Sequence, residues 1–178
     1  MLIIHIPNII TLVRISLIPV FVALLLYNHF EYALYIFIFA GVSDTLDGFL
    51  ARRLNLHTEL GKLLDPIADK FLLITSFIVY MHIDWVPIWF TITVLSRDLF
   101  IVIGWILRYL IFDTTKVQPS PIGKWAVAMQ MILVGYILLE NTLSFNSLLY
   151  EIMIWITVIL TVASGLQYIY KGLTYTNE

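Results

Sequence analysis

Long apolar runs constrain this chain more than any other feature of its sequence. Six such runs follow one another, at about 9–27, 32–51, 61–81, 86–110, 122–139 and 147–170. Each is close to the roughly 20 residues that a helix needs to cross the hydrocarbon core of a bilayer. Because 61% of the residues are hydrophobic, 12% are charged and the mean hydropathy is +0.94, the sequence predicts an all-α, polytopic membrane helix bundle with about six transmembrane helices.

Length and composition narrow the remaining possibilities. A chain of 178 residues is the size of one domain, so we expect a single membrane domain over residues 1–178. The sequence contains no cysteine, which excludes disulfides and thiol chemistry. The net charge is −2 and there is no basic tail, so nothing in the sequence indicates a nucleic-acid partner.

The distribution of positive charge predicts an orientation in the membrane. The ten basic residues are Arg14, Arg52, Arg53, Lys62, Lys70, Arg97, Arg108, Lys116, Lys124 and Lys171. None of them lies in the connections after the first, third and fifth runs, whereas the connections after the second and fourth runs and the tail carry most of them. Cytoplasmic segments are the ones enriched in Lys and Arg. We therefore expect both termini and the connection after the second run to be cytoplasmic.

Four aspartates interrupt the apolar pattern around that second connection. Asp44 and Asp47 are three residues apart, and Asp65 and Asp69 are four apart, so each pair shares one face of a helix. A charge at the centre of a membrane helix costs about 2.5–3.5 kcal/mol, which makes chance placement of four of them unfavourable. Carboxylates that gather without a cation repel one another, and oxygen ligands favour Mg²⁺, Mn²⁺ or Ca²⁺. The pattern predicts a helical hairpin that carries a cation site near its connection, although helix caps and loop-edge charges are the simpler alternative.

The stretch from Asp44 to Asp69 resembles the signature of the CDP-alcohol phosphatidyltransferase family, D-x2-D-G-x2-A-R-x8-G-x3-D-x3-D. Every fixed position is present, as Asp44, Asp47, Gly48, Ala51, Arg52, Gly61, Asp65 and Asp69. The resemblance implies a two-metal site for Mg²⁺ or Mn²⁺ held by the four aspartates. It also implies transfer of a phosphatidyl group from CDP-diacylglycerol to an alcohol with release of CMP, a step of phospholipid biosynthesis.

The resemblance also implies roles for the other signature residues. Asp69 would act as general base for the acceptor hydroxyl in addition to binding metal. Arg52 would contact a donor phosphate, and Gly48, Ala51 and Gly61 would line the nucleotide site. Members of the family typically pair as homodimers, so we expect a homodimer surrounded by membrane lipids, in a bacterial inner membrane.

A second, shorter resemblance lies at the start of the first run. Residues 7–14 are similar to the family's opening P-N-x-I-T-x-x-R. Asn8, Thr11 and Arg14 recur at three-residue steps and share a helix face. They are predicted to help hold the nucleotide or the carboxylates of the site; capping by Asn8 with a snorkelling Arg14 is the alternative.

Four basic residues are candidates for binding the acceptor. Arg97 lies in the middle of the fourth run, where an arginine is a functional candidate, and Arg108, Lys116 and Lys124 lie towards the cytoplasmic ends of the fourth and fifth runs. These last three have a simpler interpretation as anchors for lipid phosphates. Because adjacent helical residues do not face each other, Arg97 and Asp98 are expected to have separate partners.

The identity of the acceptor is open between two branches of the family. Gly123, Lys124 and Gln130 resemble the branch that uses glycerol 3-phosphate, and residues 96–98 and 119–120 resemble the CMP-forming cardiolipin synthases, which use phosphatidylglycerol. Ala126 and Val127 replace the second Lys and the Thr of the first branch's motif. We favour glycerol 3-phosphate and keep phosphatidylglycerol as the alternative.

Two functions of other classes compete with this prediction. An ion transporter also places carboxylates within the membrane, but its site typically lies at the midplane between repeats or broken helices. A lipid-binding scaffold without activity would not need a complete set of aspartates. Metal-dependent release of CMP would exclude both.

Overall fold

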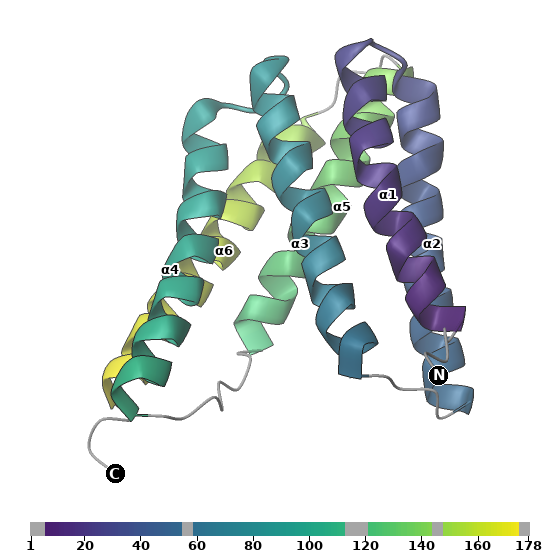
Figure 1. Cartoon of the computed structure of the whole chain (residues 1–178). Coiled ribbons are helices and arrows are strands. Elements are labelled where there is room, and N and C mark those ends of the chain that lie inside the picture. Colours follow the sequence, from purple (N-terminus) through teal and green to yellow (C-terminus); the bar gives the residue numbers. More distant parts are fainter. Residues whose placement is uncertain (1–5, 55–58, 113–120, 144–147, 175–178) are drawn as a thin grey trace. The chain divides into compact units, whose positions relative to one another are not determined.

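The computed structural model describes residues 6–54, 59–112, 121–143 and 148–174. Near several helix ends, and at a few positions within α4, it describes the backbone alone. Every regular element in the described ranges is an α-helix, in the order α1 (Ile6–Leu26), α2 (Phe30–Leu54), α3 (Glu59–His82), α4 (Ile88–Phe112), α5 (Pro121–Leu143) and α6 (Leu149–Thr174) (Figure 1). The prediction of an all-α chain with six helices, one for each apolar run, is confirmed.

Two tight turns show why helices end where they do. Asn28 follows α1 with φ of 62°, and the backbone N–H of His29 donates to the carbonyl of Leu24 at 2.8 Å. Asp84 adopts φ of 59° just after α3, where the N–H of Ile83 donates to the carbonyl of Val79 at 3.0 Å. Asn and Asp tolerate this left-handed conformation, which lets the last carbonyls of a helix find donors.

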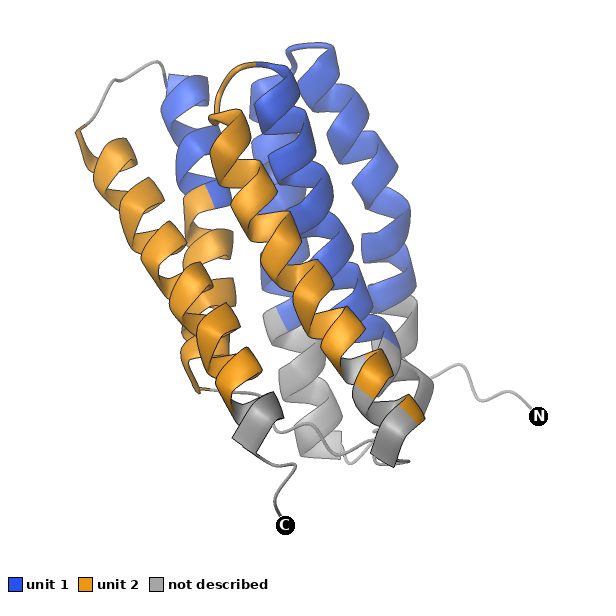
Figure 2. Ribbon diagram, turned by 90° about the vertical axis from the view of Figure 1, so that its left-hand side faces the viewer, with its two compact units in different colours: residues 1–83, 134–146 blue, residues 84–133, 147–178 orange. Residues whose placement is uncertain are grey.

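The chain divides into two compact units (Figure 2). Unit 1 comprises Met1–Ile83 and Val134–Asn146, and unit 2 comprises Asp84–Leu133 and Ser147–Glu178, so the boundary falls within α5. The expectation of a single domain over residues 1–178 stays a prediction.

In unit 1, α1 packs against both α2 and α3. The buried face of α1 repeats at intervals of three and four residues through Thr11, Arg14, Ile18, Phe21 and Leu25. This spacing produces one continuous stripe on a helix. Because the stripe is apolar from Ile18 onwards and polar at Thr11 and Arg14, one end of the helix packing is a hydrophobic core and the other end is polar.

The part of α5 that belongs to unit 1 is joined to α2 and α3 by specific contacts. The Tyr80 hydroxyl of α3 is buried and donates to the Val134 carbonyl at 3.1 Å. A Cβ added at Gly135 would lie 3.0 Å from Cε1 of Phe37 on α2, so a glycine lets the ring approach the α5 backbone closely.

In unit 2, α6 has an apolar outer face and a polar buried face. Thr157, Thr161 and Ser164 are buried, whereas large apolar side chains such as Trp155 and Ile159 are exposed. Thr161 accepts a hydrogen bond from the Gln130 amide of α5 at 3.1 Å. A helix that hides its polar residues and exposes its apolar ones suits a lipid environment, where interhelical hydrogen bonds join helices.

Two helices of the described residues are long and apolar enough to cross a membrane, as judged by length and composition: Pro121–Leu143 and Leu149–Tyr170. The segment Thr11–Leu26 is also apolar but shorter. These findings support membrane association, and six crossings stay a prediction.

Candidate active site

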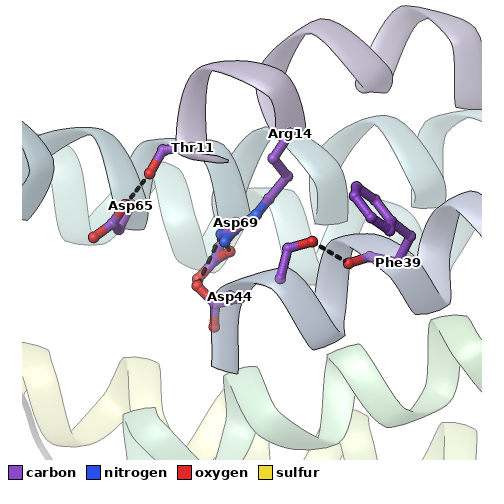
Figure 3. Close-up of polar contacts among 7 residues, drawn as sticks. Thr11, Arg14, Phe39, Asp44, Asp65 and Asp69 are labelled. Atoms are coloured by element: carbon purple, nitrogen blue, oxygen red, sulfur yellow. Dashed lines mark hydrogen bonds and ion pairs between the residues drawn. The ribbon is translucent and has the colours of Figure 1, made fainter. Parts of the chain in front are cut away.

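Three aspartates of unit 1 gather against the polar end of α1 (Figure 3). Arg14 donates through a single nitrogen, Nη1, to Oδ1 of Asp44 on α2 at 2.8 Å and to Oδ1 of Asp69 on α3 at 3.0 Å. The Thr11 hydroxyl donates to Oδ1 of Asp65 on α3 at 2.6 Å. Side chains from three helices therefore form one polar cluster. The residues of α1 and α3 that meet in it are more than 50 residues apart in the sequence.

The local sequence explains how each helix presents its carboxylate. On α2, Ala33, Ala40 and Asp44 lie at steps of seven and four residues, so Asp44 continues a face whose small buried alanines let α1 approach. On α3, Asp65 and Asp69 precede the buried Leu72 and Ser76 on one stripe. Each aspartate thus lies where the packed face of its helix turns from apolar to polar.

Burial differs between the two sides of the cluster. The Arg14 side chain is 2% exposed, whereas the Asp44 and Asp69 side chains are 43% and 30% exposed. The guanidinium therefore lies beneath the carboxylates, which remain accessible from outside. Burial of the arginine strengthens its attraction to the carboxylates, because the effective dielectric constant falls with burial, while the exposure of the carboxylates lets solvent screen part of that attraction.

The donor set has the chemistry of a hard-cation site, since its ligands are carboxylate oxygens. The two Oδ1 atoms of Asp44 and Asp69 share one nitrogen, so they lie no further apart than two hydrogen bonds end to end. Within the described side chains, no group of three His, Cys, Asp or Glu residues is close enough to hold an ion. Asp47, the fourth predicted ligand, has no described side chain.

Comparisons with known proteins identify the family of this chain. The sequence matches the model of the CDP-alcohol phosphatidyltransferase family over residues 4–163, which include all three aspartates and parts of both units. The chain belongs to the CDP-alcohol phosphatidyltransferase family. The resemblance predicted from the Asp44–Asp69 stretch is confirmed.

Individual relatives of this family cover nearly all of the chain. The chain is 36% identical to the CDP-diacylglycerol–glycerol-3-phosphate 3-phosphatidyltransferase of Bacillus subtilis, over 94% of this chain and 95% of that protein. The enzyme of the same name from Rickettsia prowazekii is 31% identical, over 96% of this chain and 97% of that protein. The CMP-forming cardiolipin synthase of Homo sapiens is 32% identical, over 94% of this chain and 61% of that protein.

The remaining signature residues of the family lie on α2 and α3. Asp47, Gly48, Ala51 and Arg52 belong to α2 and Gly61 belongs to α3, all in stretches where the backbone alone is described. Asn8 lies in the first turn of α1, also without a described side chain. Their predicted contacts with metal or nucleotide stay predictions.

The polar face of α1 was predicted to hold either the nucleotide or the carboxylates, and the described contacts are with carboxylates. Thr11 was assigned to the nucleotide and is found bonded to Asp65; a nucleotide role for it stays a prediction. Arg14 was predicted to help hold the nucleotide or the carboxylates, with a snorkelling role as the alternative, and it is found bonded to Asp44 and Asp69. Its three-residue spacing from Thr11 was the signal that indicated a shared face.

The predicted acceptor residues that the structure describes, Arg97, Arg108 and Lys124, belong to unit 2. Arg97 of α4 is buried in unit 2, where its Nε donates to Oγ of Ser164 on α6 at 3.1 Å. Lys124 is exposed on α5, Arg108 lies on α4 without a described side chain, and Lys116 lies outside the described residues.

One expectation about Arg97 is wrong. Arg97 and Asp98 were expected to have separate partners, but Nη1 of Arg97 donates to Oδ1 of Asp98 at 2.7 Å. The long arginine side chain bends along the helix and reaches its neighbour despite the roughly 100° between adjacent positions. The buried Ser164 was not singled out, because a lone serine in an apolar run carries no spacing signal.

Proposed function

We propose that this protein transfers a phosphatidyl group from CDP-diacylglycerol to an alcohol and releases CMP, as a step of phospholipid biosynthesis. The observation that carries the proposal is the convergence of Asp44, Asp65 and Asp69 from α2 and α3 on Thr11 and Arg14 of α1. Membership of the family and the names of the relatives support the same reaction. Three of the four acidic residues of the signature, on α2 and α3, have described contacts with α1.

The carboxylates have two roles in the proposed reaction. Asp44, Asp47, Asp65 and Asp69 would hold two Mg²⁺ or Mn²⁺ ions, which fits a donor set of carboxylate oxygens that face outward from a buried arginine. When bound, the ions supply positive charge that neutralises the pyrophosphate of the donor as CMP leaves. Asp69 also accepts the proton of the acceptor hydroxyl, which makes that oxygen a better nucleophile.

The rest of the signature would hold the donor. Arg52 pairs with a donor phosphate, because a guanidinium matches phosphate oxygens in geometry and charge. Gly48, Ala51 and Gly61 leave room for the nucleotide beside the hairpin backbone. Asn8 and Thr11 would add hydrogen bonds from α1 to the nucleotide, with Thr11 shared between the nucleotide and Asp65.

Glycerol 3-phosphate is the acceptor that we propose. The full-length similarity to two relatives named for glycerol 3-phosphate supports it, as do Gly123, Lys124 and Gln130. Arg97, Arg108, Lys116 and Lys124 would attract the phosphate of this acceptor. Phosphatidylglycerol is the second candidate, because relatives named cardiolipin synthase align over 94% of this chain.

The proposed setting is a bacterial inner membrane that all six helices cross, with both termini and the hairpin connection in the cytoplasm. The distribution of Lys and Arg supports this orientation, and the exposed apolar face of α6 supports contact with lipid. A homodimer is the proposed assembly.

The test is an acceptor panel with purified full-length protein in detergent. We expect CMP release from CDP-diacylglycerol with glycerol 3-phosphate and Mg²⁺ or Mn²⁺, and none with EDTA. Release that requires phosphatidylglycerol instead would assign the cardiolipin branch. No CMP release with either acceptor, in the presence of both metals, would refute phosphatidyl transfer and leave the transporter and scaffold alternatives.

A further inference from the structure

Arg14 contacts two carboxylates of the acidic cluster at once. One nitrogen atom of its guanidinium donates to an oxygen of Asp44 and to an oxygen of Asp69, which come from different helices. These are two of the four carboxylates that the proposed function assigns to metal. The arginine therefore uses the same oxygens that a divalent ion would use.

The burial of the three side chains indicates that Arg14 and an incoming ion contact the carboxylates from opposite sides. Arg14 is almost completely buried, and the two aspartates are each about a third exposed or more. An ion that arrives from outside meets the carboxylates first and finds the guanidinium behind them. A carboxylate oxygen that binds both a metal and Arg14 holds two like charges within a few ångströms of each other, and their repulsion is strong at the low effective dielectric constant of a buried site.

Resting on the proposed function, we propose that Arg14 is a resident counter-cation of the metal site. Its guanidinium balances Asp44 and Asp69 when no divalent ion is bound, and it withdraws from at least one of the two shared oxygens when an ion binds. Without such a cation, the neighbouring carboxylates repel one another and destabilise the packing of α1 against α2 and α3. With it, the cluster folds without metal and binds metal more weakly than the carboxylates alone would.

The test measures binding of Mn²⁺ alone, by calorimetry on the full-length protein in detergent. In Arg14→Gln the positive charge is lost while a hydrogen-bond donor remains, and we expect Mn²⁺ to bind at least about tenfold more tightly than to wild type. Arg14→Lys keeps the charge, so its Kd should stay within about threefold of wild type. Arg97→Gln is the matched control, since it removes a buried, paired arginine of unit 2; its Kd should also match wild type.

Thermal melting separates this role from a simple structural one. Arg14→Gln should melt well below wild type in EDTA and recover most of the deficit in saturating Mn²⁺, whereas Arg97→Gln should show the same deficit in both. An Arg14→Gln protein that binds Mn²⁺ with unchanged or lower affinity, or whose deficit is the same in EDTA and in Mn²⁺, would overturn the proposal.

A measurement on wild type keeps the proposal testable should Arg14→Gln fail to fold. The guanidinium ¹⁵N signals of Arg14, assigned with Arg14→Lys, should shift during a Mg²⁺ titration and saturate with calorimetric binding, while those of Arg97 stay in place. Unmoved Arg14 signals at saturation would overturn the proposal and leave the proposed function intact. Absence of metal binding in wild type and variants alike would instead remove the metal site of the proposed function.

Discussion

Arg14 and Arg97, the two arginines that are buried among the described side chains, make opposite kinds of contact. Arg14 in unit 1 joins aspartates of two other helices, 30 and 55 residues away. Arg97 in unit 2 pairs with the next residue, Asp98, and with the neutral Ser164, 67 residues away. Arg14 contacts two carboxylates. Arg97 contacts one carboxylate, which balances its charge, and its hydrogen bond to Ser164 joins α4 to α6.

This difference distinguishes a candidate cation-binding site from a structural contact between two helices. A balanced buried pair adds little net charge and contributes mainly to packing and specificity. Among the described side chains, the Arg14 cluster holds three aspartates and one arginine, and this surplus of negative charge attracts cations. We expect changes in unit 1 to affect catalysis and metal binding, and changes in unit 2 to affect stability and, at the proposed acceptor residues, the KM for the acceptor.

The largest expected effect is in Asp69→Asn. The amide can neither accept the proton of the acceptor nor carry the charge that metal requires, so turnover should fall by on the order of 10³-fold. CMP release by purified protein measures the loss, and an unchanged melting profile shows that the fold is retained. Asp84→Asn is the control, because Asp84 lies exposed in a turn where Asn also tolerates the positive φ. Near-normal turnover in Asp69→Asn would refute the assignment of Asp69 as the general base.

Asp44→Ala tests the other arm of the hairpin. It removes one proposed ligand and one partner of Arg14, so both Mg²⁺ or Mn²⁺ affinity and activity should fall by at least about tenfold. Calorimetry with Mn²⁺ measures the first and CMP release the second. Unchanged metal affinity would count against a ligand role for Asp44.

A smaller effect is expected for Ser164→Ala in unit 2. A hydrogen bond to a charged group contributes about 1.5–3 kcal/mol, so the free energy of unfolding should fall by about 2 kcal/mol while turnover at low temperature is kept. Thermal melting in detergent measures the change. Ser76→Ala is the control, because Ser76 is also buried but bonds the Leu72 carbonyl of its own helix; an equal loss in both variants would show that Ser164 has no special role in joining α4 to α6.

The smallest effects distinguish two helical glycines. A Cβ at Gly104 of α4 would lie 2.7 Å from Cε1 of Tyr168 on α6, so Gly104→Ala should destabilise the protein by about 1 kcal/mol as the ring shifts. A Cβ at Gly41 of α2 meets nothing within 4 Å. Gly41→Ala should stabilise the protein by roughly 0.5–1 kcal/mol, because alanine favours the helix. Melting temperatures that move in the same direction for both would contradict this packing of α4 on α6.

The sequence predicted the helices well, because each apolar run has the length and uniformity of a helix and the turns carry Asn28 and Asp84. It also predicted that Asp65 and Asp69 share a face of α3, since they are four residues apart. It predicted that Asn8, Thr11 and Arg14 share a face that holds the nucleotide or the carboxylates, but it did not predict which carboxylate each side chain contacts. Pairing of Arg14 with both arms depends on how α1 packs, and a contact between distant helices leaves no local pattern.

The neighbouring pair Arg97–Asp98 was misjudged for a related reason. Spacing rules describe the directions of the Cα–Cβ bonds, whereas the end of a long flexible side chain can bend away from the direction of its own Cα–Cβ bond. Ser164 gave no signal at all, because the sequence does not reveal that α4 and α6 pack together.

The most direct test of the central claim is anomalous diffraction from crystals of the full-length protein soaked in Mn²⁺. We predict anomalous peaks about 2 Å from carboxylate oxygens of Asp44, Asp47, Asp65 and Asp69, between α2 and α3. Strong peaks elsewhere with none between these two helices would contradict the proposal that the hairpin holds the catalytic metal.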